Sequence, residues 1–343
     1  MKTIITFFCI GFISFTMQAQ PKVITVDNNP DSGANYTNLA TAIANSMVND
    51  TIYVQPSATS YGNITITKPL VIMGPGHNPA NSNGTTANVA GISIGGYCAN
   101  TIITGLVINY ISYTTATDAD NVKIVNNRID SYIATNPYAT TFYDDWVIEG
   151  NYFNAAYVNP SGAAGWIIKN NIFNNTTYAI YNFNDTNSFI NNIVINTTGN
   201  FATGCTNPIV NNNIFILKTN IVNVGLTNST IQFNNNLTIN VEGFTVNLLN
   251  GNNNLDNTYP NFVDAPLITI SSIYDNNYDL AGSSAANDAG TDGTDLGVFG
   301  ANFKFDVNGR PDVWPYMTSL TITNTSVASG QDINVEFTAE KKN

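Results

Sequence analysis

Residues 166–173 read Trp-Ile-Ile-Lys-Asn-Asn-Ile-Phe, and an Asn-Asn pair followed by a large apolar residue returns about every 21 residues through the middle of the chain. A fixed period in this range marks a repeat architecture, in which each unit stacks on its neighbours. The second asparagine of each pair steps by 24, 20, 21, 21, 23 and 18 residues. These asparagines are Asn127, Asn151, Asn171, Asn192, Asn213, Asn236 and Asn254.

Each repeat opens with a short run in which apolar residues alternate with others, as in Trp146/Ile148 and Trp166/Ile168. This alternation with β-branched and aromatic residues is a strand signal, and Asn, Gly, Thr, Asp and Ser between the runs favour turns. Such short strands cannot bury an apolar face alone. The units are therefore expected to stack into an all-β parallel solenoid, with coils about 4.8 Å apart.

The asparagine pair has a physical reason to recur. A corner between two strands needs a residue that tolerates left-handed backbone angles, and Asn does so better than most residues other than Gly. Gly150 replaces the first asparagine in one copy, which meets the same demand. The second asparagines are expected to form an internal ladder, in which each side-chain amide bonds to its equivalents one coil above and below.

The two ends of the chain differ from the repeats. Residues 1–19 have the charge and apolar pattern of a signal peptide with cleavage after Ala19, so we expect a secreted or cell-surface protein. No later stretch is apolar enough to span a membrane. Residues 20–50 are predicted to form an N-terminal cap, with a helix over 37–47 and Thr37 as its N-cap.

The sequence predicts the parallel β-helix over residues 51–285. Residues 286–343 are predicted to form a closing segment and a C-terminal β-hairpin packed on the far end of the solenoid. The mature chain keeps Cys98 and Cys205, which lie too far apart along the stack for a disulfide and are expected to be buried thiols.

The net charge is −12 at pH 7, with only 10% charged residues. Nucleic acid and anionic membranes are poor partners for such a surface. The outside is expected to consist mainly of neutral polar groups, which suit a polysaccharide or a cell-surface glycan.

Residues 50–54 after a capping helix, followed by coils that end in Asn-Asn-x-Phe, resemble the right-handed parallel β-helix proteins of the pectin-lyase-like superfamily. Asn287-Asp288-Ala289-Gly290 and Asp295-Leu296-Gly297 are similar to a closing motif of secreted bacterial members, and residues 314–337 to a terminal piece of the Bacteroidetes type. The superfamily contains lyases, hydrolases and adhesins, so the resemblance implies a right-handed parallel β-helix but not one activity.

Two enzymatic alternatives follow from this resemblance. A polysaccharide lyase would need a strong base, for which Lys123 and Arg128 are the candidates, and Ca²⁺ or another cation to neutralise a carboxylate. A glycoside hydrolase would need two carboxylates, for which Asp144 and Asp145 are the candidates, although a solvated turn is the favoured explanation of this pair.

The remaining candidate residues concern binding. Ligand-binding candidates on the segment where related proteins have their cleft are Tyr143, Asp145, Tyr181, Asn182 and Asp185. Asp288, Asp292 and Asp295 in a Gly-rich stretch are weak candidates for a Ca²⁺ site, with turn formation as the alternative. No cofactor is predicted, and Ca²⁺ is the one metal ion for which the sequence offers candidate ligands.

The sequence therefore predicts a secreted β-helix surface or matrix protein that binds glycan or a cell surface without catalysis. The alternatives are a polysaccharide lyase or glycoside hydrolase, and a structural spacer or adhesin stalk. Outward tyrosines clustered on one face would favour binding over the spacer.

Overall fold

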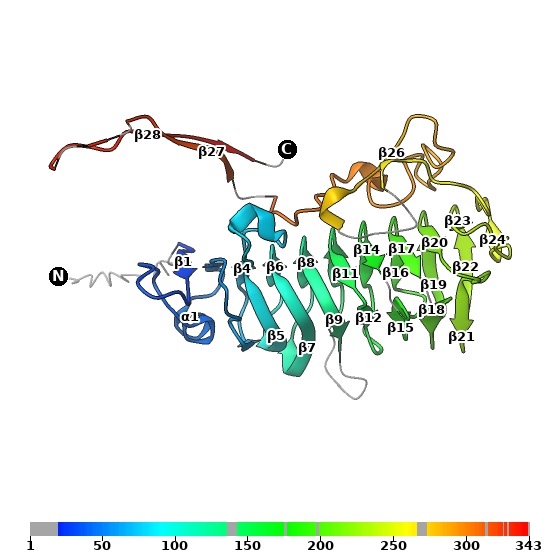
Figure 1. Ribbon diagram of the computed structural model, residues 1–343. Coiled ribbons are helices and arrows are strands. Elements are labelled where there is room, and N and C mark those ends of the chain that lie inside the picture. The colour runs from blue at the N-terminus through cyan, green and yellow to red at the C-terminus, as the bar shows by residue number, and fades with distance from the viewer. Residues whose placement is uncertain are drawn as a thin grey trace, which may run out of the picture.

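The computed structural model describes residues 20–341 except for 136–142, 175–176, 197–198, 266–272, 313–314, 325 and 328. The chain winds into a parallel β-solenoid, as predicted, and its coils follow one another along a single axis (Figure 1). The predicted signal peptide, residues 1–19, lies outside the described residues. Among those described, no helix has the length and apolarity needed to cross a membrane.

The first sheet has eleven strands among the described residues, and each successive coil contributes one strand to it. All its neighbours pair in parallel, as in Ile124↔Ile148↔Ile168. In spatial order the strands are β1 (Val23–Val26), β2 (Thr51–Val54), β4 (Val71–Met73), β6 (Ile102–Thr104), β8 (Lys123–Val125), β10 (Val147–Glu149), β13 (Ile167–Lys169), β16 (Ser188–Ile190), β19 (Thr206–Asn211), β22 (Thr230–Asn234) and β24 (Gly251–Asn252).

The second sheet divides into two arms at β9 (Arg128–Ala134), whose first residues pair with β11 and whose last residues pair with β12. Before the division lie β3 (Asn63–Ile66), β5 (Asn88–Tyr97) and β7 (Val107–Asp118). One arm contains β11 (Tyr152–Asn154), β14 (Ile172–Asn174), β17 (Ile193–Asn196), β20 (Ile214–Leu217) and β23 (Leu237–Asn240). The other contains β12 (Tyr157–Asn159), β15 (Ile180–Tyr181), β18 (Asn200–Thr203) and β21 (Gly225–Thr227).

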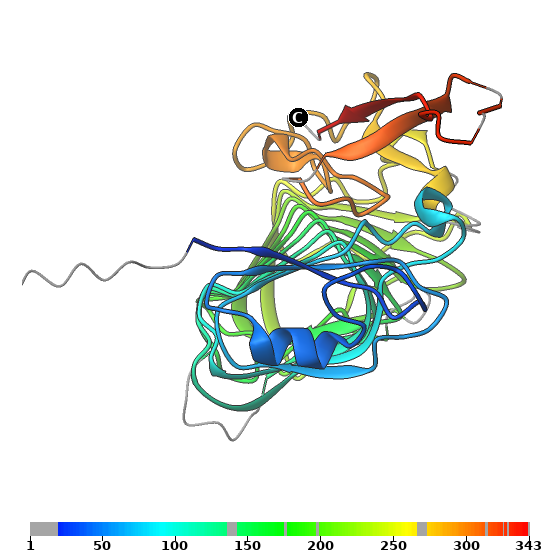
Figure 2. The same ribbon diagram turned by 90° about the vertical axis from the view of Figure 1, so that its left-hand side faces the viewer.

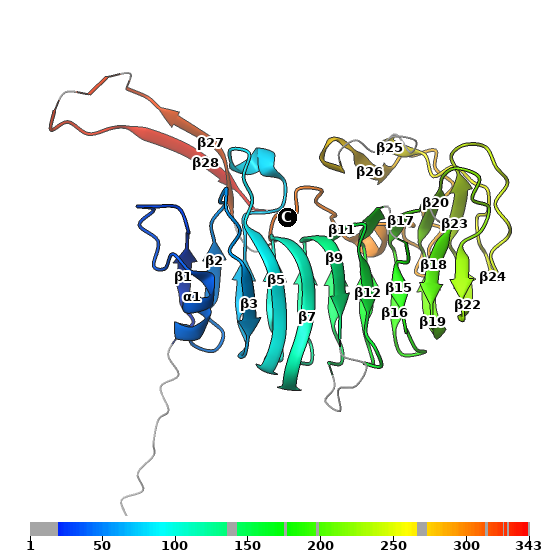
Figure 3. The same cartoon turned by 60° about the horizontal axis from the view of Figure 1, so that its bottom comes forward.

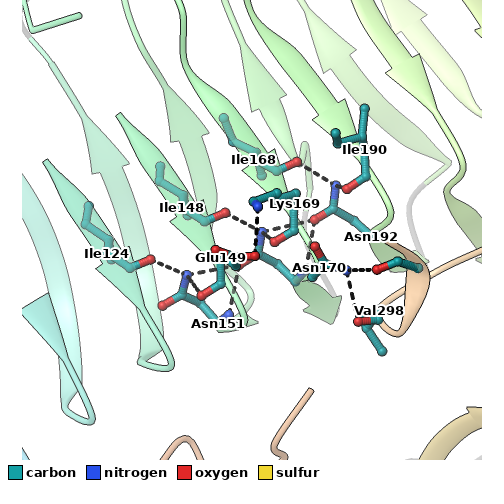
Figure 4. A network of polar contacts seen from close by, with 12 residues as sticks. Ile124, Ile148, Glu149, Asn151, Ile168, Lys169, Asn170, Ile190, Asn192 and Val298 are labelled. Atoms are coloured by element: carbon teal, nitrogen blue, oxygen red, sulfur yellow. Dashed lines mark hydrogen bonds and ion pairs between the residues drawn. The ribbon is translucent and has the colours of Figure 1, made fainter. Parts of the chain in front are cut away.

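The asparagine ladder is confirmed. Asn192 Oδ1 accepts bonds from the backbone N (2.9 Å) and Nδ2 (3.0 Å) of Asn171, while Asn192 Nδ2 donates to the carbonyl of Ile168 at 3.0 Å (Figure 4). The same pattern links all seven second asparagines from Asn127 to Asn254. Each ladder amide thus replaces the strand hydrogen bonds that the corner interrupts, and all of them except the half-buried Asn254 do so in the buried interior.

Aromatic side chains fill the interior and stack from coil to coil. Trp146 and Trp166 lie parallel, with ring centroids 4.6 Å apart and an interplanar angle of 7°. Phe153 and Phe173 pack the same way at 4.2 Å. Cys98 and Cys205 are buried free thiols, as expected.

A short helix, α1 (Leu39–Asn45), lies at the N-terminal end of the solenoid (Figure 2). Leu39, Ala42 and Ile43 are buried in the same apolar cluster as the first coils, so the helix caps the core. Its predicted start was wrong by one residue. Asn38, not Thr37, is the N-cap, because its side chain accepts a bond from the backbone N of Thr41 at 2.9 Å.

The C-terminal part of the chain returns along the outside of the solenoid (Figures 1 and 3). It contains β25 (Phe262–Asp264), β26 (Asn277–Leu280) and the short 3₁₀ helices η2 (Ile273–Asp275) and η3 (Gly300–Asn302). We call residues 286–312 the strap. Apolar residues of this part join outward residues of β11, β14, β17, β20 and β23 in a second buried cluster, to which Ile172, Ile193, Ile214, Tyr278, Leu296 and Val298 belong.

Five of the first asparagines, Asn126, Asn170, Asn191, Asn212 and Asn235, bond to the strap. These asparagines have positive φ, and their side chains point out of the corner toward strap backbone atoms. Asn170 Nδ2 donates to the carbonyls of Val298 (3.1 Å) and Gly300 (3.0 Å), as Figure 4 shows in part. Other copies bond to Arg310, Asp295, Thr291 and Ala289. Within one motif, the second asparagine therefore links neighbouring coils and the first asparagine links the coil to the strap.

The prediction that the C-terminal hairpin packs on the far end of the solenoid is wrong. The strap runs back toward the first coils, where the carbonyl of Asn308 accepts a bond from the backbone N of His77 at 2.9 Å. The hairpin of β27 (Tyr316–Ile322) and β28 (Val335–Glu340) then projects from the N-terminal half (Figure 3). Met317 at its base lines a cavity with Tyr53, and η1 (Pro79–Ser82) also borders this region.

Candidate functional site

Four outward tyrosines form a row across β7, β9, β12 and β15. Tyr110 and Tyr132 stack with ring centroids 5.4 Å apart and 20° between their planes, and Tyr132 and Tyr157 stack at 5.7 Å and 24°. Tyr181 continues the row 4.6 Å from Tyr157, with its ring tilted by 50°. All four are half-buried, so each keeps part of its side chain at the surface.

The strand register creates this row. Gly91, Tyr110, Tyr132 and Tyr157 occupy one register position on successive strands. At Gly91 the lack of a side chain makes room, since a Cβ there would lie 2.3 Å from the ring of Tyr110. Because the rings cover one another's faces, the row presents mainly ring edges and phenolic hydroxyl groups. Tyrosine offers this combination of apolar area and a hydrogen-bonding group with little rotamer entropy to lose.

Burial favours the neutral form of two hydroxyl groups in the row, those of Tyr132 and Tyr181. Burial first, and then the neighbouring tyrosines Tyr110 and Tyr157, raise the pKa of Tyr132 above its ordinary value. Burial, then Tyr157 and Tyr178, likewise raise the pKa of Tyr181. Tyr132 and Tyr181 therefore present O–H donors rather than phenolates.

Two of the predicted binding residues lie beside this row. Asn182 and Asp185 are exposed in the turn after Tyr181. Asn182 adopts a positive φ of 54°, and its Nδ2 donates to Asn159 Oδ1 at 3.2 Å. Tyr143, in contrast, is only 2% exposed and packs edge-on against Trp146 in the core. Its ring therefore presents no surface to an external ligand.

The aspartates proposed as a hydrolase pair occupy a tight turn. Asp144 Oδ1 accepts a bond from the backbone N of Ala164 at 2.7 Å, and its own backbone N donates to Asp120 Oδ1 at 2.8 Å. Asp145 is exposed, with a φ of 60°. Burial, followed by the charges of Asp144 and other neighbouring aspartates, raises the pKa of Asp120. These contacts give the pair a role in the turn, and the hydrolase hypothesis stays a prediction.

The candidate lyase bases lie apart from this turn. Lys123 is exposed on β8 of the first sheet, whereas Arg128 is on β9 of the second. Arg128 Nε pairs with Asp130 Oδ1 at 2.8 Å. Within the described residues neither base forms an ion pair with Asp144 or Asp145. The structure thus assembles no site from all four catalytic candidates.

The proposed metal ligands have backbone partners in the strap. Asp295 Oδ1 accepts a bond from the backbone N of Asp288 at 3.0 Å, and Asp292 Oδ1 accepts from Thr294 N at 3.2 Å. In the part of the chain that the structure describes, no group of three or more His, Cys, Asp or Glu residues has the arrangement of a metal site. The described contacts are those of turn formation.

Three members of the tyrosine row, Tyr110, Tyr132 and Tyr157, were not predicted from the sequence. Their spacing to Tyr181 follows the repeat period, which was a usable signal. Comparison with protein families and with curated proteins gives no match to this chain. The function therefore has to be argued from the geometry alone.

Proposed function

We propose that this chain is a secreted, non-catalytic surface or matrix protein that binds glycan through the tyrosine row. The observation that carries the proposal is the alignment of Tyr110, Tyr132, Tyr157 and Tyr181 on one outer face. Aromatic residues are enriched at binding surfaces because they bury much area for few rotatable bonds. A spacer needs no such row, since the interior stacks and the ladder already hold the coils together.

Electrostatics favour a neutral glycan as the partner. The chain has a net charge of −12, which opposes the approach of a polyanion. The row itself is uncharged and offers hydroxyl groups at the spacing of the coils. A hydroxyl-rich polymer lying along the solenoid axis would meet one tyrosine after another.

Export through residues 1–19 places the proposed glycan outside the cell. The resemblance to the pectin-lyase-like superfamily of secreted Bacteroidetes proteins agrees with this location and with a carbohydrate partner. The second candidate function is catalytic, either a hydrolase carried by Asp144 and Asp145 or a lyase carried by Lys123 and Arg128.

The test is retention of purified Gln20–Asn343 on neutral and acidic polysaccharides, measured by affinity electrophoresis and calorimetry. We expect the double variant Tyr132→Ala/Tyr157→Ala to bind at least about tenfold more weakly, equivalent to about 1.4 kcal/mol. Tyr259→Ala is the matched control, because Tyr259 is 53% exposed and lies outside the row. If the double variant and the Tyr259→Ala control bound glycan equally well, the tyrosine row would not be the glycan-binding site.

Turnover is followed in the same samples. New reducing ends and the absorbance of unsaturated uronates are measured with Ca²⁺ and then with EDTA. Reducing ends that disappear in Asp145→Asn would replace the binding proposal with a hydrolase. If the protein neither bound nor cleaved any polysaccharide, the structural spacer would be the remaining function.

A further inference from the structure

A polar pocket of about 530 Å³ shares strands β7 and β9 with the tyrosine row. Its walls come from residues 57–60, from the loop that holds His77 and residues 84–86, and from the first residues of β5, β7 and β9. Asn88, Val107 and Arg128 line it from one register position on these three strands. The volume falls within the range of small-ligand sites.

An oriented ion pair forms part of the wall. Arg128 Nε donates to Asp130 Oδ1 at 2.8 Å, and Asn154 Nδ2 donates to the same oxygen at 3.1 Å. Both side chains of the pair are about a third exposed, at 32% and 28%. Burial lowers the pKa of Arg128, but hydrogen bonds with Asp130 and Tyr274 outweigh this and raise it, so the guanidinium stays charged. The pair therefore offers N–H donors and carboxylate acceptors side by side without net charge.

The histidine in the wall is neutral as well. The Tyr274 hydroxyl donates to the carbonyl of His77 at 2.8 Å, so its oxygen accepts the 3.3 Å contact from His77 Nδ1. Burial, then the charge of Arg128, lowers the pKa of His77 to about 3. An imidazole in this state adds no positive charge to the pocket.

The rest of the lining consists mostly of hydroxyl and amide groups, among them Ser57, Thr59, Thr86 and Asn88. A phosphate or carboxylate would meet Asp130 as well as Arg128, and the two charges would cancel. A pair of neighbouring sugar hydroxyls fits better, because each can accept from the guanidinium and donate to the carboxylate. Charge-assisted bonds of this kind are the strong ones.

We propose that this pocket binds one uncharged pyranose unit of the glycan that the tyrosine row holds. The inference rests on the proposed function and extends it. Tyr132 follows Arg128 by four residues on β9, so the row and the pocket lie within about 13 Å along the strand. One chain can then lie against the tyrosines and place a single unit in the pocket.

Asn88→Ala is the informative variant. Among the described residues the Asn88 hydrogen bonds involve its backbone carbonyl, which accepts from Tyr61 N at 2.9 Å and from Ser60 Oγ at 3.3 Å. Truncation of the side chain keeps both bonds. Thr86→Val is a second variant that removes one hydroxyl group at constant shape.

The probes are glucose, galactose and mannose, with glucuronate and inorganic phosphate as anions, titrated into Gln20–Asn343 and followed by calorimetry and ligand-observed NMR. We expect at least one neutral sugar to bind, and Asn88→Ala or Thr86→Val to weaken it at least about fivefold. Tyr132→Ala/Tyr157→Ala should change this affinity less than about twofold while it abolishes retention of the polymer.

Three outcomes would refute the proposal that the pocket binds a neutral sugar. They are preferred binding of phosphate or glucuronate, unchanged sugar affinity in both pocket variants, and polymer binding without binding of any neutral monosaccharide. The last would leave the tyrosine row intact as the glycan site. If every tyrosine variant still bound the polymer as the unsubstituted protein does, the proposed function itself would be refuted.

Discussion

Replacing Asn192 with alanine would remove one rung from the middle of the asparagine ladder. Its Oδ1 accepts two bonds from Asn171, and its Nδ2 donates to the carbonyls of Ile168 and Ile190 and to Asn213 Oδ1. Asn192 is fully buried. The variant leaves the backbone N–H of Asn171 and the carbonyl of Ile168 without these bonds. Each stranded buried group costs about 1–3 kcal/mol, so we expect a loss of about 4 kcal/mol.

Asn254→Ala is the matched control at the end of the ladder. Asn254 accepts bonds from Asn236 and donates to the carbonyl of Phe233 at 2.9 Å, but it is half-buried, so water can reach the groups that its removal leaves unpaired, and we expect a smaller loss of about 1 kcal/mol. Urea unfolding followed by circular dichroism measures both variants, compared at equal m-values because a solenoid can unfold in parts. Equal losses in the two variants, or a loss below about 1 kcal/mol in Asn192→Ala, would refute the ladder argument.

Three further predictions concern the strap, the buried histidine and the tyrosine row. Gly309 has a φ of 65°, and a Cβ there would lie 2.0 Å from His77 Cδ2, so Gly309→Ala should lose about 2–4 kcal/mol in urea unfolding. Gly282→Ala, with no atom within 4 Å of its Cβ, should change little, and equal effects would argue against the close contact. Because burial lowers the pKa of His77 to about 3, the unfolded chain binds a proton below pH ~6.5 that the folded chain does not. Stability should therefore fall as pH decreases from ~6.5 to ~5, with a slope approaching about 1.4 kcal/mol per pH unit, and this slope should vanish in His77→Gln. Glycan retention should change less than about twofold between about 50 mM and 500 mM salt, since the tyrosine row is uncharged, whereas a steep salt dependence would point to an ionic site.

The ladder could be predicted because its signal is local and periodic. Each second asparagine bonds to the copies one coil away, and the spacing of the copies is visible in the sequence. The strap could not be predicted in the same way. Asn126 bonds to Arg310 and Asn170 to Val298 across 184 and 128 residues, and no repeat links these partners. The first asparagine was therefore assigned only to the corner, although its amide also binds the strap.

Only part of the proposed tyrosine site could be predicted from the sequence. Tyr181, Asn182 and Asp185 lie at the surface as expected, but Tyr143 is in the core. Alternation within a strand tells inward from outward residues, but it fails in the irregular turn before Trp146. The other tyrosines of the row escaped notice because they sit outside the Asn-Asn motif. Arg128 was considered as a lyase base, and its pairing with Asp130 depends on a local side-chain geometry that spacing alone does not reveal.

The strap has a consequence for the order in which the parts of the chain are synthesised and covered. The outward row of Ile172, Ile193 and Ile214 belongs to coils that are synthesised before residues 286–312, which cover it. Until those residues arrive, the finished coils carry an apolar strip and a line of unpaired amides on their outside. Such surfaces promote association between incomplete chains. The last part of the chain thus acts as a seal, and a product that stops before it should be prone to aggregation even though its coils are already wound.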